Sequence, residues 1–304
     1  MAAIVTAFLW CQEHGGFAMS SAEWKVLYST IQAVDKATPR AGRRTVYSDV
    51  LIVAMYFWTV WHDRPRCWAA QREHYGSVFR PRRLPSRSQF CRRLRGARCA
   101  SLVAAVQPRL AQSDVPTAFM FLDGRAFPVG PDSTDADARP GRCSGGFARG
   151  YKLHALVTED GRFPHIRVTP LNAGESGGAR ELVAAATLGG VVLADGNYDD
   201  SRLYDAVSAR GALLFTPLPA NAGRGNHYQA WSRLLAAQLW AGGVPPCYGR
   251  RRAVERYFGQ LSAFGGGLAP LPAWVRTLPR VRLWITAKVA IYHVRLLTRS
   301  AAAG

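Results

Sequence analysis

Acidic residues are scarce in this sequence. The 304-residue chain has 20 Asp and Glu against 39 Lys and Arg, which gives a formal net charge of +19 and an isoelectric point near 10.5. A balance this basic points to a polyanionic partner such as DNA, RNA or an acidic membrane surface. The apolar fraction of 48% excludes wholesale disorder, and 304 residues are enough for one large or two modest domains.

Paired cysteines are also missing. None of the six cysteines forms a CxxC pair, and no histidine lies at zinc-finger distance, so we expect no structural zinc site. We interpret them as reduced thiols of a cytoplasmic protein associated with the nucleoid. They are Cys11, Cys67, Cys91, Cys99, Cys143 and Cys247.

Long hydrophobic runs are absent as well. The apolar segments 50–61 and 281–297 are too short for a membrane span or are interrupted by charge, so we expect no membrane association. The apolar start of the chain lacks the charged region of a signal peptide. We interpret residues 1–19 as an N-terminal extension. If translation starts at Met19, the residues before it are not translated. Residues 300–304 form a short tail.

Positive charge is concentrated near the N-terminus. The stretch from Arg40 to Arg98 contains fourteen arginines and three acids, more than half of the net charge. Guanidinium groups suit phosphate contacts, so residues 20–112 are predicted to be a DNA-binding region.

This region has the sequence pattern of an all-α structure. A helix should begin after Ser20, residues 50–61 should form a buried helix, and a proline-rich turn should precede a basic helix capped by Ser86 or Ser88. That last helix carries Arg92 and Arg93, our candidate DNA-binding residues. A helix-turn-helix and a helical bundle with a solvated basic face explain the pattern equally well.

Residues 117–299 show a different, mixed pattern. Strands are predicted at 118–122, 151–158, 163–169, 191–194 and 212–216, with helices at 175–188 and 199–210 and another around Glu255. The expected fold is therefore α/β, a mixed five-stranded sheet flanked by helices. We expect the acidic loop with Asp132, Asp135 and Asp137 to be solvated. Trp231, Trp240 and Trp274 could stack on nucleic-acid bases, but we expect them to pack in the core.

Two acids, Asp123 and Asp195, follow short apolar strands and precede glycine. Tyr248, Arg251 and Glu255 are spaced three and four residues apart, which predicts one helical face. If Glu255 faces the two aspartates, the three carboxylates form an oxygen cage that suits Mg²⁺ or Mn²⁺. Two such ions support in-line displacement at a phosphate.

Four motifs together resemble the DDE-type transposases of bacterial insertion sequences. They are Asp123-Gly-Arg-Ala-Phe-Pro-Val, Gly150-Tyr-Lys-Leu-His154, Leu193-Ala-Asp195-Gly-Asn-Tyr-Asp199 and Tyr248-x2-Arg251-x3-Glu255. The resemblance runs from about residue 118 to 264, with a weaker echo around Tyr47-Ser48-Asp49 and Leu84–Arg93.

The resemblance implies an RNase H-like catalytic domain over residues 117–299. It also implies catalysis by Asp123, Asp195 and Glu255 with two Mg²⁺ ions, or Mn²⁺ as substitute. The reaction would be cleavage at element ends followed by 3′-hydroxyl transfer into target DNA, by a homodimer bound to terminal repeats. Tyr248, Arg251 and Lys152 would contact DNA. We expect His154 instead to be a half-buried histidine whose hydrogen bonds are made within the protein.

One departure from the family pattern concerns a lysine that often follows the glutamate by seven residues. Ser262 stands there, which weakens a phosphate contact. Two alternatives therefore stay open beside the active transposase: a decayed or repurposed transposase that only binds DNA, and a structure-specific nuclease of the same fold.

Overall fold

The computed structural model describes residues 19–39, 45–112, 117–218, 229–263, 267–268 and 270–303. The interpretation of residues 1–19 as an extension thus falls almost wholly outside the described residues. The chain divides into two compact units. Unit 1 comprises residues 1–110, 261–268 and 283–304, and unit 2 comprises residues 111–260 and 269–282. Among the described helices, none has the length and apolar character needed to cross a membrane.

Unit 1 is helical, as its sequence pattern predicts. It contains α2 (Ser21–Ala37), α3 (Asp49–Trp61), η1 (Arg66–Ala70), η2 (Arg72–His74), α4 (Arg87–Arg95), most of α5 (Ala97–Ala111) and most of α10 (Leu278–Ala303). The starts of α2 and α4 are fixed by capping boxes: Ser20 with Glu23, and Ser86 with Gln89. Each box satisfies backbone N–H groups that have no partner inside the helix.

Helix α3 is the centre of this unit. Every residue from Ile52 to Trp61 is buried, which confirms the predicted buried helix. Between α3 and α4 lie η1, η2 and connecting segments, residues 62–86, rather than the short turn of a helix-turn-helix. The described arrangement therefore favours the helical-bundle alternative for this region.

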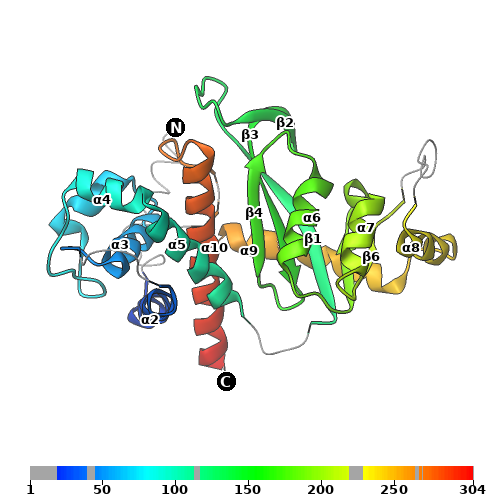
Figure 1. The fold of residues 1–304 in the computed structure, drawn as a ribbon, viewed down its shortest axis with the longest axis horizontal. Coiled ribbons are helices and arrows are strands. Elements are labelled where there is room, and N and C mark those ends of the chain that lie inside the picture. Colours follow the sequence, from blue (N-terminus) through cyan, green and yellow to red (C-terminus); the bar gives the residue numbers. More distant parts are fainter. Residues whose placement is uncertain are drawn as a thin grey trace. The chain divides into compact units, whose positions relative to one another are not determined.

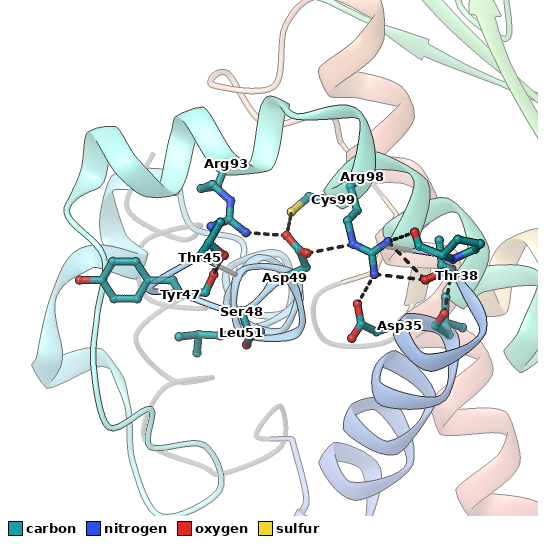
Figure 2. Close-up of polar contacts among 12 residues, drawn as sticks. Asp35, Thr38, Thr45, Tyr47, Ser48, Asp49, Leu51, Arg93, Arg98 and Cys99 are labelled. Atoms are coloured by element: carbon teal, nitrogen blue, oxygen red, sulfur yellow. Dashed lines mark hydrogen bonds and ion pairs between the residues drawn. The ribbon is translucent and has the colours of Figure 1, made fainter. Parts of the chain in front are cut away.

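Two aspartates and two arginines hold four of these helices, α2, α3, α4 and α5, together (Figure 2). Arg98 donates to Asp35 of α2 at 2.6 Å and to Asp49 of α3 at 2.9 Å, while Arg93 donates to Asp49 at 2.5 Å. Burial opposes ionisation of Asp49, but the hydrogen bonds from Arg93 and Arg98 outweigh it and hold the pKa of that carboxyl below its usual range. Part of the arginine excess is therefore structural.

Unit 2 is built on a mixed sheet (Figure 1). Its strands are β1 (Phe119–Pro128), β2 (Arg139–Cys143), β3 (Gly146–Thr158), β4 (His165–Pro170), β5 (Val191–Ala194) and β6 (Leu213–Phe215). Strand β3 pairs antiparallel with β1, β2 and β4, whereas β1 pairs parallel with β5, and β5 parallel with β6. The predicted fold class is confirmed, with six strands in place of the expected five.

Helices cover both faces of the sheet. Leu122 and Leu156 belong to one buried cluster with residues of α6 (Glu175–Ala185), α7 (Ser201–Ser208) and α8 (Trp231–Ala241). On the other face, the Phe121 ring lies 6.2 Å from that of Tyr257 in α9 (Arg252–Ala263). Alternate residues of β1 thus face α6 and α9 in turn, as the twofold periodicity of a strand requires.

Several local expectations were wrong. Asp135 is buried instead of solvated: it accepts a hydrogen bond from the Tyr151 hydroxyl at 2.6 Å and one from the Thr277 N–H at 2.9 Å. The Trp231 side chain is 72% exposed and does not pack in the core. Helix α8, which begins at Trp231, was not anticipated at all.

Candidate active site

Asp123 and Asp195 lie next to each other on neighbouring strands. The parallel pairing of β1 with β5 ends at Leu122 and Ala194; Asp123 is the next residue of β1, and Asp195 follows directly after β5. Asp195 lies just past the end of its strand, as predicted, whereas β1 continues through Asp123 to Pro128 because its other edge stays paired with β3. The backbone beneath Asp123 is thus held by pairing, which fixes the position of the carboxylate.

Arg251 joins the two carboxylates. One guanidinium nitrogen lies 3.3 Å from Asp123 Oδ2 and 3.8 Å from Asp195 Oδ2. The remaining oxygens are held by backbone groups: the Gly124 N–H donates to Asp123 at 2.8 Å and the Asn197 N–H to Asp195 at 2.9 Å. Two carboxylates that converge on one cation define a site for positive charge.

Burial sets the electrostatics of this pair. Loss of solvation raises the pKa of Asp123 to about 6, although Arg251 and the Gly124 N–H oppose the rise. Burial also raises the pKa of Asp195, with the Asn197 N–H opposing it. Two neighbouring acids whose ionisation is disfavoured in the folded chain are typical of functional sites.

A stability measurement can test this cost directly. Asp123→Asn is expected to raise the free energy of unfolding at pH 7.5, by at most about 3 kcal/mol, because the folded state no longer has to hold a buried charge. A raised folded pKa means that native Asp123 contributes its full stability below pH 4 and loses it as pH rises through 6. The gain from Asp123→Asn should therefore vanish near pH 4.

Urea unfolding in EDTA at pH 4, 6 and 7.5 measures the effect. Asp132→Asn is the matched control, because Asp132 is exposed in the loop after β1 and should show little change. A gain from Asp123→Asn that is the same at all three pH values would contradict the assigned cost of ionisation.

The predicted helical face of Tyr248, Arg251 and Glu255 is only partly correct. Tyr248 and Arg251 belong to the 3₁₀ helix η4 (Pro246–Arg251), and α9 begins one residue later. The Tyr248 hydroxyl donates to the carbonyl of Ala194 at 3.1 Å and so attaches η4 to the end of β5. Glu255, in the first turn of α9, is exposed.

These residues fit a cation in part. The Asp123 and Asp195 oxygens already converge on a positive group, and carboxylate oxygens are the ligands that Mg²⁺ and Mn²⁺ prefer. Within the part of the chain that the structure describes, however, no three acids, histidines or cysteines are grouped closely enough to hold a metal ion. Glu255 does not complete the expected cage in this conformation.

A second charged pair lies on the α6 side of the sheet. Lys152 of β3 is paired with Glu175, the first residue of α6, with Nζ 2.6 Å from Oε1. His154, on the same strand, is fully buried and its Nε2 lies 2.9 Å from the Thr169 hydroxyl. Burial lowers the pKa of His154 to about 4, so it is neutral at physiological pH, in line with a satisfied histidine.

The candidate DNA-binding arginines of α4 differ in their surroundings. Arg92 is exposed, whereas the guanidinium of Arg93 is shared between Asp49 and the carbonyl of Tyr47. Arg92 is thus the more available of the two for a phosphate.

Comparison with known proteins identifies the class. Residues 116–292 match the family model described as the transposase DDE domain, which covers more than half of the chain. This chain therefore belongs to the DDE transposase family, and it is an enzyme of the nuclease and transesterase kind. No curated protein matches it.

Among solved structures, the chain is similar to a piggyBac transposase in a synaptic complex with hairpin DNA, determined by cryo-electron microscopy. The two share 9% sequence identity with a TM-score of 0.45, over 94% of this chain and 74% of that one.

Proposed function

We propose that this transposase cleaves DNA at the ends of an insertion sequence and joins the freed 3′-hydroxyl to target DNA, with two Mg²⁺ ions held by Asp123, Asp195 and Glu255. The observation that supports it best is the convergence of Asp123 and Asp195 on a single positive group. When bound, the ions would supply the charge that stabilises the attacking and leaving oxygens.

Arg251 has a specific role in this proposal. In the described conformation its guanidinium occupies the place between the aspartates that a cation would take. Its Nε is buried and has no hydrogen-bond partner. Release from the aspartates would let Arg251 contact a DNA phosphate, and Glu255, four residues farther along, would turn toward the vacated oxygens.

The other proposed contacts involve both units. Lys152 supplies a positive charge from the neighbouring strand, Tyr248 positions η4 against β5, and Arg92 and Arg93 bind DNA on unit 1. Ser262, near the end of α9, replaces the lysine that the family pattern often has. That lysine would hold a phosphate rather than a metal. We therefore expect its absence to weaken DNA binding without abolishing catalysis. We also propose that a homodimer pairs the two ends.

The test is a joining reaction. Labelled duplexes that carry the repeats flanking the reading frame are incubated with the full chain, target DNA and Mg²⁺ or Mn²⁺. We expect nicked ends and joined products that depend on the metal. Hydrolysis without joining would instead favour the nuclease alternative, and binding without either product would favour the repurposed DNA-binding protein.

A further inference from the structure

A carboxylate outside the family motif lies beside the catalytic pair. Glu175 begins α6, and its side chain is 22% exposed, against 13% for its partner Lys152. Its charge acts on the active site, since it raises the pKa values of Asp123 and Asp195. The negative charges of Glu175, Asp123 and Asp195 repel one another in a partly buried region. This arrangement lowers the stability of the fold, so stability does not explain it.

Lys152 brings a positive charge to this region from β3. Its stem lies against Gly124, the residue after Asp123: a Cβ atom at Gly124 would be 3.5 Å from Lys152 Cδ. Lys152 also lowers the pKa of Asp195, so its ammonium acts on that carboxylate as well as on Glu175. Because the lysine side chain is long and flexible, its ammonium could move if Glu175 were removed.

The pair is incompletely satisfied, which a purely structural ion pair would avoid. Glu175 Oε2 is buried and lacks a hydrogen-bond partner. The hydroxyl of Tyr198, a residue only 1% exposed, also lacks one, and it lies 3.4 Å from where a Gly124 Cβ would be. Burial, and after it the charges of Glu175, Asp123 and Asp195, raise the pKa of this tyrosine. Unpartnered buried polar groups here indicate a site completed by a ligand.

We propose that Glu175 is a positioning residue of the catalytic centre, which holds the Lys152 ammonium away from Asp195 and so keeps that carboxylate free for a cation. The inference rests on the proposed metal centre. Without Glu175, Lys152 loses its ion-pair partner, and Asp195 is an acid on which its charge also acts. The ammonium then competes with the divalent ion for the same oxygens.

A double-mutant cycle with Mn²⁺ binding as the readout tests this on the full chain without DNA. Calorimetry or electron paramagnetic resonance measures the Mn²⁺ affinity of the wild type, Glu175→Gln, Lys152→Met and the double variant. We expect Glu175→Gln to weaken Mn²⁺ binding about tenfold, as partners of metal ligands commonly do. The double variant should regain the affinity of Lys152→Met, because the competing ammonium is gone.

Glu181→Gln is the matched control on the same helix. Glu181 pairs with Arg167 and is 55% exposed, so its removal should leave Mn²⁺ affinity unchanged. Thermal melting confirms that each variant is folded.

Two results would overturn the inference: unchanged affinity in Glu175→Gln, or a double variant as weak as Glu175→Gln, which would make Glu175 act independently of Lys152. A wild-type chain that binds no Mn²⁺ and cuts no DNA would count against the proposed function itself. Wild-type binding and joining with no Glu175 effect would count against this inference alone.

Discussion

Asp195→Asn is expected to lower the rate of DNA-end cleavage at least about a thousandfold, equivalent to about 4 kcal/mol of transition-state stabilisation. The substitution keeps the shape of the side chain and its hydrogen bond from the Asn197 N–H, which reaches Asp195 at 2.9 Å. It removes one of the two charges that converge on Arg251. The effect should therefore fall on chemistry and metal binding and leave the fold intact.

DNA affinity separates this explanation from general damage. Loss of a negative charge near a basic surface should leave DNA binding unchanged or slightly tighter. Cleavage is followed on labelled end duplexes and binding by fluorescence anisotropy at fixed salt. Asp132→Asn, which removes an exposed charge, should cleave at the wild-type rate. Cleavage by Asp195→Asn within tenfold of the wild type would remove Asp195 from the mechanism.

Arg233→Met should be the most destabilising of the substitutions considered. Arg233 of α8 donates two hydrogen bonds of 2.7 Å to Asp199, and the side chains are only 6% and 4% exposed. Removal of one partner from a buried ion pair leaves the other charge without compensation, which costs about 3–5 kcal/mol. The hydrogen bonds that Arg233 donates to Asp199 raise the pKa of Arg233, so its guanidinium stays charged.

Urea unfolding at pH 7.5 measures this cost. Arg180→Met is the matched control: Arg180 pairs with Asp200 at 3.2 Å, but these side chains are 36% and 31% exposed. The control should lose less than about 1 kcal/mol. Adding Asp199→Asn to Arg233→Met should recover part of the loss, because it removes the unpaired carboxylate. Equal effects of Arg233→Met and Arg180→Met would show that burial does not govern these pairs.

The hydrophobic patterns predicted most of the strands and helices of unit 2. Alternating and apolar runs located β3 and β5, and the Asp-Gly pairs after apolar segments led to Asp123 and Asp195. These signals are local, so a single sequence carries them. The buried helix α3 and the cap at Ser86 were predictable for the same reason.

Interactions between distant segments were not predictable. Strand β2 comes from a loop rich in glycine, proline and aspartate, and it forms because β3 extends far enough to pair with it. The spacing of Tyr248 and Arg251 suggested an α-helix, but Pro245, Pro246 and Gly249 favour the 3₁₀ geometry that the structure has.

Some side-chain partners also escaped prediction. Asp199 and Asp200 both precede α7 and were both candidates for its cap: Asp200 does cap the helix, whereas Asp199 pairs with Arg233. Glu175 is the first residue of α6, and only the packing of α6 on β3 brings it to Lys152. No sequence spacing encodes either contact.

The proposed function depends on Asp123, Asp195 and Glu255 meeting at one metal centre. The most direct measurement is a structure of the chain bound to its end DNA with Mn²⁺, located by anomalous scattering. We expect an ion with an oxygen of each carboxylate at about 2.1 Å and Arg251 moved onto a phosphate. An ion bound elsewhere, or Glu255 still facing solvent while the ion is held, would contradict the proposed site.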